Sequence, residues 1–281
     1  MALSSLRGVI AAVPTPVTPE GEPDIARFVR HGSWALANGC DALNVLGTTG
    51  EANSFSADQR KAVMAAAAAE LDTSRLMVGT GTPDIATTIA LTEYAYELGF
   101  AAALVLPPYY YKGVSDDGLF AWFERLIMAT RDRPGPIYLY NFPQLTGVPF
   151  SVDFARRLKT AFPDRIAGAK DSSGDLAYAS RLAEIPGFDV FPSSETSIAK
   201  AASEGYAGCV SASVSVTAPL VGRFWADPQN GALAAKVAEA RTAIAAYPLV
   251  PSVKHLTAVI HGDPSFERVL PPHLALTEAQ K

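Results

Sequence analysis

Hydrophobic and polar positions along the chain fall into two kinds of block. Short apolar runs bounded by glycine, proline or polar turns are typical of buried strands. Apolar residues at helical spacing, with a cap such as Ser56 before them or Gly39 after them, are typical of helices. The pattern predicts strands at 8–13, 42–46, 76–80, 102–106, 136–140, 166–170, 188–191 and 208–211. It predicts helices at 24–38, 56–71, 85–98, 119–130, 154–161, 176–185 and 196–204, and from 218 onward.

Strands and helices alternate with short connections, which indicates parallel strands joined by crossover helices. Eight such strands before residue 218 favour a closed barrel over an open, doubly wound sheet. No glycine fingerprint for a dinucleotide or a phosphate follows the first strand, which weakens the open-sheet alternative. We therefore expect an α/β fold: a (β/α)8 TIM barrel over 1–217, with C-terminal helices over 218–281 that complete and extend the same domain.

Composition narrows the class of protein. The 281 residues are 49% hydrophobic and 18% charged, which predicts a well-filled globular core. The net charge is -5 and the basic residues are scattered, so nucleic acid is not an expected partner. Two cysteines, Cys40 and Cys209, are too few for a disulfide framework. The segment 1–7 lacks the features of a signal peptide, and no apolar run approaches the roughly 18 residues of a membrane span, so we expect no membrane partner and a cytoplasmic location.

Chemically useful residues recur where predicted strands end, which in a barrel is the face that carries the active site. Lys170 ends one strand, where a partly desolvated amine can become a nucleophile that forms Schiff bases. Tyr140 ends another and could move protons. The turn 47–50 places two hydroxyls between glycines, which suits a carboxylate. Singly, these could be a lysine reaching to water, a core aromatic and an ordinary loop. Together they favour a site.

Three motifs carry a family resemblance: Gly47-Thr48-Thr49-Gly50-Glu51, Tyr140-Asn141-Phe142-Pro143 and Gly168-Ala169-Lys170. In this order they resemble the dihydrodipicolinate synthase / N-acetylneuraminate lyase family of pyruvate-dependent class I aldolases. The similarity extends from about Gly8 to the segment 251–254. It implies a barrel with added C-terminal helices, assembled as a homotetramer that is a dimer of dimers.

The resemblance also implies roles for single residues. Lys170 would form the Schiff base with a 2-keto acid, typically pyruvate, and Tyr140 would shuttle protons. Thr48 would link Tyr140 to a second tyrosine, which matches Tyr110 and in relatives reaches into the neighbouring subunit's site.

The same resemblance implies how the keto acid is held. Its carboxylate would lie against the turn formed by Thr48, Thr49 and Gly50, and the backbone of Val210 would face the bound pyruvate. No cofactor is expected beyond the covalent Schiff base. No metal is expected either, because the histidines show no ligand spacing on a shared element, which disfavours a zinc-dependent aldolase. These histidines are His31, His255, His261 and His273.

Departures from the family pattern bear on the substrate. Leu145 stands where dihydrodipicolinate synthases carry an arginine for the second substrate's carboxylate, and leucine cannot make that contact. The segments 108–112 and 170–175 are similar to 2-keto-3-deoxy-sugar-acid aldolases. On that basis Ser172, Ser194 and Glu195 would line a pocket for a polyol. Alternatively, Glu195 is an acidic residue stabilised at a helix N-terminus.

Three functional hypotheses follow. The first is a class I aldolase that reversibly cleaves a 2-keto-3-deoxy sugar acid, or a related 2-keto acid, to pyruvate and an aldehyde. The second is a keto-deoxy-acid dehydratase or a hydratase-aldolase that uses the same lysine iminium, with Phe142 and Leu145 favouring a less polar acceptor. The third is a catalytically silent barrel that binds a sugar acid. The activity of a dihydrodipicolinate synthase is disfavoured by Leu145.

Overall fold

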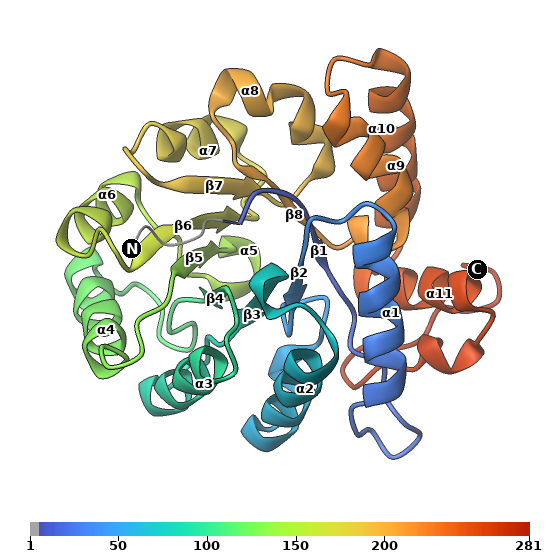
Figure 1. Cartoon of the computed structure of the whole chain (residues 1–281), viewed down its shortest axis with the longest axis horizontal. Coiled ribbons are helices and arrows are strands. Elements are labelled where there is room, and N and C mark those ends of the chain that lie inside the picture. Colours follow the sequence, from blue (N-terminus) through green and yellow to red (C-terminus); the bar gives the residue numbers. More distant parts are fainter. Residues whose placement is uncertain (1–5) are drawn as a thin grey trace.

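The computed structural model describes residues 6–281 and places one eight-stranded parallel sheet at the centre of the molecule (Figure 1). Residues 1–5, on which part of the signal-peptide argument rests, lie outside the described residues. The strands are β1 (Gly8–Ala12), β2 (Ala42–Val45), β3 (Leu76–Gly79), β4 (Ala102–Val105), β5 (Ile137–Asn141), β6 (Ile166–Asp171), β7 (Asp189–Pro192) and β8 (Gly208–Ser211).

The strands curl into a nearly closed barrel. Their order is β7-β6-β5-β4-β3-β2-β1-β8, and neighbours pair in parallel. Where β7 approaches β8, the amide of Ala207 donates to the carbonyl of Val190 at 2.9 Å. Helices surround the strands, as Figure 1 shows. They are α1 (Ile25–Ala37), α2 (Ala57–Glu70), α3 (Ile85–Glu97), α4 (Asp116–Ala129), α6 (Val152–Ala161), α7 (Leu176–Ala183), α8 (Ala201–Glu204) and α9 (Val214–Ala226). The predicted (β/α)8 barrel is thus confirmed.

Alternate residues of each strand face opposite sides of the barrel wall, because side chains alternate along a strand. Ile10 and Val210 lie in the apolar cluster inside the barrel, whereas Val9 and Ala11 pack against the surrounding helices. Tyr140 belongs to the inner cluster. The period of two along β5 therefore directs its ring into the barrel.

Local capping chemistry sets several helix ends. Ser56 accepts a hydrogen bond from the amide of Gln59, whose side chain accepts one from the amide of Ser56, so α2 begins with a capping box. Gly39 follows the end of α1 with φ +115°, a conformation that favours glycine. Both helix ends agree with the sequence pattern.

Short elements depart from the pattern. The short helix α5 (Pro143–Thr146), which has a proline in its first turn, was not predicted from the sequence pattern. The helix predicted at 196–204 is a 3-10 helix, η3 (Glu195–Lys200), followed by α8. Two further 3-10 turns are η1 (Ala52–Ser54) and η2 (Thr73–Arg75).

The C-terminal part packs on one side of the barrel, next to α9 and α1 (Figure 1). It consists of α10 (Gly231–Ala245), α11 (Leu249–His261) and η4 (Pro264–Glu267). The predicted boundary at 217/218 falls inside α9, where Thr217 leaves helical geometry. The expectation of helix to the end of the chain is wrong for residues 268–281, which are not helical. Among residues 6–281 no single helix is long and apolar enough to cross a membrane; α10 and α11 pass that test only as a pair bent by 113°.

Candidate active site

Lys170 lies near the end of β6, and its side chain faces the interior of the barrel, as that of Tyr140 does. Residue pairing between β5 and β6 sets Lys170 beside Tyr140. Lys170 is only 4% exposed, and its Nζ donates a hydrogen bond to the Oη of Tyr140 at 3.2 Å. Nζ also lies 4.3 Å from the centre of the Tyr140 ring. The buried amine therefore contacts a phenol on the adjacent strand.

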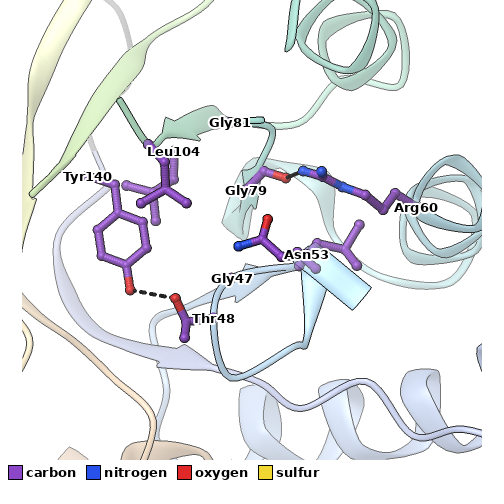
Figure 2. Close-up of a pocket in the computed structure, with 11 residues that line it drawn as sticks. Gly47, Thr48, Asn53, Arg60, Gly79, Gly81, Leu104 and Tyr140 are labelled. Carbon is purple, nitrogen blue, oxygen red and sulfur yellow. Dashed lines mark hydrogen bonds between the residues drawn. The ribbon is translucent and has the colours of Figure 1, made fainter. Parts of the chain in front are cut away.

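The hydrogen-bonded chain continues from Tyr140 to the turn after β2. The Oη of Tyr140, itself 3% exposed, lies 3.1 Å from the Oγ1 of Thr48 (Figure 2). Lys170, Tyr140 and Thr48 come from three different strand ends and form one continuous path of polar atoms. These three residues were predicted to act together, and the structure brings them within hydrogen-bonding distance.

The turn that follows β2 is tightly built. Leu46 and Glu51, which flank it, adopt φ values of +53° and +52°, an uncommon conformation for residues other than glycine. The turn closes on itself, because the amide of Glu51 donates to the carbonyl of Thr48 at 3.0 Å. A Cβ on Gly47 would lie 2.5 Å from the Oδ1 of Asn44, so a larger residue here would require the buried Asn44 side chain to shift. Thr49 is buried in the same turn.

A small cavity of about 20 Å³ has Thr48 and Tyr140 on one side (Figure 2). Its volume suits a water molecule. The opposite wall carries Arg60, whose Nη2 donates to the carbonyl of Gly79 at 2.8 Å. Burial lowers the pKa of Arg60 to about 10, so the guanidinium stays charged at neutral pH. Nothing in the residues around Arg60 distinguishes it from a surface arginine, so this position could not be predicted from the sequence.

A second pair of polar residues holds the ends of β5 and β6 together. The Nδ2 of Asn141 donates to the Oδ1 of Asp171 at 2.7 Å, and the hydroxyl of Ser173 donates to Oδ2 at 2.8 Å. Burial raises the pKa of Asp171. Asn141 and Asp171 directly follow Tyr140 and Lys170, so their contact fixes the two reactive side chains relative to one another. Their shared position after these residues was the only signal in the sequence.

Glu195 was predicted to meet substrate hydroxyls, but its carboxylate is already engaged within the chain. Oε2 accepts hydrogen bonds from Ser211 at 2.7 Å and from Arg241 at 2.9 Å, and Oε1 accepts one from Ser213. Glu195 is the first residue of η3, and its side chain is buried against β8 and α10. These contacts favour a role for Glu195 in holding β8, and its expected contact with a substrate stays a prediction.

The other predicted residues divide between the barrel interior and its rim. Val210 is buried in the same interior cluster as Tyr140. Ser172 is half-buried and its amide donates to the carbonyl of Asn141 at 2.8 Å, whereas the hydroxyl of Ser194 lies 2.7 Å from that of Thr196. Tyr110 is 74% exposed and its ring meets the edge of Tyr111. Among residues 6–281 no hydrogen bond joins Tyr110 to Thr48, so the path expected between them stays a prediction.

This arrangement can do specific chemistry. A lysine amine within reach of a keto carbon can add to it, and a phenol in contact with that amine can pass protons. The backbone amides of a glycine-containing turn can hold a carboxylate. Among residues 6–281, no group of three or more His, Cys, Asp or Glu is placed to hold a metal ion.

The barrel and its site define a class of enzyme, the carbon–carbon lyases of the pyruvate class I aldolase type. The profile described as the Dihydrodipicolinate synthetase family matches residues 5–260, and the chain belongs to this family. A protein from Chloroflexus aurantiacus, described as an uncharacterized DapA-like lyase, is 34% identical over 233 residues, which are 82% of this chain and 77% of that protein.

Solved structures of relatives agree. Dihydrodipicolinate synthase from Agrobacterium tumefaciens superposes with a TM-score of 0.89 at 31% identity, over 97% of this chain and 95% of that one. A prophage protein of the dihydrodipicolinic acid synthase family from E. coli K12, in complex with pyruvate, superposes with a TM-score of 0.87 at 25% identity, over 99% and 95%.

Proposed function

We propose that the protein is a Schiff-base aldolase that reversibly cleaves a 2-keto-3-deoxy sugar acid, or a related 2-keto acid, to pyruvate and an aldehyde. The observation that carries the proposal is the path from the buried Lys170 amine to Tyr140 at 3.2 Å and on to Thr48 at 3.1 Å. Family membership and the pyruvate complex of the E. coli relative support it.

In the proposed mechanism the neutral amine of Lys170 adds to the keto carbon, and the carbinolamine loses water to give an iminium. Tyr140 donates a proton to the departing oxygen. The iminium then accepts the electron pair of the breaking C3–C4 bond and becomes an enamine, while a base removes the proton of the C4 hydroxyl. Tyr140 suits this role once it has given up its own proton. The aldehyde leaves, Tyr140 returns the proton it has taken up to C3 of the enamine, and water releases pyruvate from the resulting iminium on Lys170.

The turn at 47–50 is the proposed site for the keto-acid carboxylate. Thr48 and Thr49 supply hydroxyls, and the turn up to Gly50 supplies backbone amides, which together suit an anion. Val210 would face the same ligand from β8. In this arrangement the carboxylate is held on one side of the barrel axis, and the keto carbon is directed toward Lys170.

Leu145 guides the choice of the aldehyde. It lies in α5 with 63% of its surface exposed, so its position offers an apolar contact and no cationic one. We infer an acceptor aldehyde without a carboxylate. A second candidate, the synthase activity named for the A. tumefaciens relative, is favoured by the 31% identity to that protein. The dehydratase outcome uses the same iminium, but loss of a proton from C3 gives the enamine, which then expels the C4 hydroxyl as water and leaves the C3–C4 bond intact.

Borohydride trapping tests the proposal. The protein is incubated with pyruvate, reduced, digested and weighed peptide by peptide. We expect the mass of a reduced pyruvyl group on the peptide that contains Lys170, and no such mass in the Lys170→Ala variant. A folded wild-type protein without the adduct would refute the Schiff-base mechanism.

Product analysis then separates the outcomes. Release of pyruvate from a 2-keto-3-deoxy sugar acid supports the aldolase, whereas loss of water with the carbon skeleton intact supports the dehydratase. In the reverse direction, pyruvate is offered with a neutral polyhydroxylated aldehyde and with an aldehyde of similar length that carries a carboxylate. Preference for the second would favour the synthase.

We also propose that the site is completed by a second copy, within a homotetramer. The support is the exposed pair Tyr110 and Tyr111, since large exposed aromatic surfaces are typical of interfaces. Light scattering after gel filtration should give the mass of four chains. A Tyr110→Phe variant should keep that mass and lose activity; a fully active monomer would contradict the proposal.

The reaction needs no metal in this proposal. Treatment with EDTA followed by gel filtration should leave the rate unchanged, because the lysine iminium supplies the electron sink. Loss of activity that is restored by a divalent cation would contradict this part of the proposal.

A further inference from the structure

A buried ion pair lies directly behind the turn that we propose as the carboxylate site. The carboxylate of Glu51 pairs with the ammonium of Lys254, and their side chains are 0% and 1% exposed. Glu51 is the residue that follows Gly50, whereas Lys254 belongs to α11, outside the barrel. The C-terminal part of the chain therefore contacts the turn through two opposite charges.

Each charge has a further partner in one short segment. The Oε1 of Glu51 accepts a hydrogen bond from the amide of Leu270 at 2.8 Å, and the Nζ of Lys254 donates to the carbonyl of Arg268 at 2.8 Å. Burial lowers the pKa of Lys254, and Glu51 opposes that change. The turn, α11 and the segment 268–270 thus form one connected unit.

Stability alone is a weak explanation for this pair. Taking two charges out of water costs several kcal/mol per ion, and apolar replacements for buried pairs are often neutral or stabilising. Glu51 is also held at φ +52°, and such conformations persist where the surroundings enforce them, commonly at functional sites. The carboxylate of Glu51 is anchored at two points while its backbone closes the turn onto Thr48.

We propose that Glu51 and Lys254 are positioning residues for the keto acid, through which α11 sets the geometry and the affinity of the carboxylate site at 47–50. The inference rests on the proposed function of this turn. Neither side chain touches the substrate. The ion pair acts through the backbone, since a change of φ at Glu51 rotates the peptide that precedes it and reorients the amides of the turn.

The test measures how the extent of borohydride trapping on Lys170 depends on pyruvate concentration. In Lys254→Met we expect the half-saturating pyruvate concentration to rise about tenfold, equivalent to about 1.4 kcal/mol of binding. The maximal trapped fraction should stay within about twofold of the wild type, because Lys170 and Tyr140 are untouched. A higher half-saturating concentration with an unchanged maximal fraction would show that the carboxylate is held less well while the nucleophile is intact.

A double variant serves in case Lys254→Met fails to fold. Lys254→Met leaves a buried carboxylate without its cation, whereas Glu51→Gln combined with Lys254→Met removes both charges and keeps an acceptor for the amide of Leu270. We expect the double variant to fold and to show the same tenfold rise. Arg27→Met is the matched control, because it removes another ion pair of the C-terminal part. Arg27 of α1 pairs with Asp263, which lies just after α11. It should lower the melting temperature and leave the half-saturating concentration unchanged.

The outcomes are distinguishable. A normal adduct on the wild type with an unchanged half-saturating concentration in the folded double variant overturns the inference alone and leaves the pair a purely structural role. An equal rise of the half-saturating pyruvate concentration in Arg27→Met also overturns the inference, because a general loss of stability in the C-terminal part would then explain the result. Absence of any adduct on the wild type overturns the proposed function, and the inference falls with it.

Discussion

At the scale of single residues, the arrangement of Lys170 and Tyr140 joins two kinds of chemistry in one contact. The amine hydrogen-bonds to the hydroxyl and also lies over the ring, so the phenol holds the amine through two contacts. Thr48 is the second hydrogen-bond partner of the same hydroxyl. In the proposed mechanism, proton transfer and attack on the keto carbon are carried out by these neighbouring atoms.

Removal of the Tyr140 hydroxyl should slow catalysis and spare the fold. In Tyr140→Phe we expect kcat to fall by about 10²–10⁴, the usual contribution of general acid–base catalysis. Steady-state rates of pyruvate release measure this effect. Tyr138→Phe is the control, because it removes another hydroxyl from β5 two residues away from Tyr140. Equal losses in both variants would contradict a specific role for Tyr140.

Leu145→Arg should change the preference for the acceptor. The new guanidinium would lie at an exposed position in α5 and could pair with a carboxylate in a two-pronged contact. We expect the ratio of kcat/KM for a carboxylate-bearing aldehyde to that for a neutral one to rise about tenfold, about 1.4 kcal/mol. The matched control is Leu145→Gln, which is polar and uncharged. An unchanged ratio in Leu145→Arg would show that this position does not face the acceptor.

At the scale of the elements, the pairing of β5 with β6 determines which residues of the site lie next to one another. Tyr140 pairs with Lys170, and the next residues, Asn141 and Asp171, pair as well and hydrogen-bond through their side chains. A shift of one residue between β5 and β6 would direct Lys170 into the surrounding helices. The pairing of β6 with β7 on its other side constrains the same strand.

Gly168→Ala tests this constraint on β6. A Cβ at Gly168 would lie 1.8 Å from the carbonyl oxygen of Asp189, which is backbone of β7 and cannot move aside without disturbing the pairing. We expect the free energy of unfolding to fall by about 3 kcal/mol, at the upper end for overpacking. Urea denaturation measures the change. Gly231→Ala is the control, since a Cβ there meets nothing within 4 Å. Equal stability of the two variants would contradict the argument.

At the scale of the whole molecule, the first and last helices of the fold meet through histidines. His31 of α1 is fully buried, its Nδ1 lies 3.1 Å from the Nε2 of His261 in α11, and its ring stacks on Trp34. Burial, with a smaller effect of His261, lowers the pKa of His31 to about 3. Burial also lowers the pKa of His261, and Arg30 contributes to this effect.

The histidine contact predicts weaker folding in acid. Since the pKa of a histidine in the unfolded chain is about 6.5, the unfolded state binds more protons between pH 6.5 and 3. The free energy of unfolding should therefore fall as the pH drops below 6.5, and His31 should contribute about 2 kcal/mol of this loss by pH 5. Above pH 6.5 its contribution is constant.

Urea denaturation at pH 7 and pH 5 measures this effect in the wild type and in His31→Phe, which keeps an aromatic ring and removes the titrating group. The difference in stability between the two pH values should shrink in the variant. Equal differences in both proteins would show that His31 does not carry the effect.

Much of the architecture could be predicted because it depends on local pattern. Alternating apolar runs and helical periods give the barrel, and the position of Lys170 and Tyr140 at strand ends gives their shared face. The length of the final helical region could not be predicted, because residues 268–281 are shaped by their contacts with the barrel, such as the bond from Leu270 to Glu51.

The sequence by itself thus determined the fold, the face that carries the site and the candidate nucleophile and proton carrier, because periodicity and turns are written in neighbouring residues. Only the tertiary structure decided which carboxylates are bound by partners within the chain. Glu195 is satisfied by Arg241 and two serines, and Glu51 pairs with Lys254 from a distant helix. The physical reason is that a buried charge must find its partner in space, and closure of the barrel brings together residues whose positions along the chain give no sign of it.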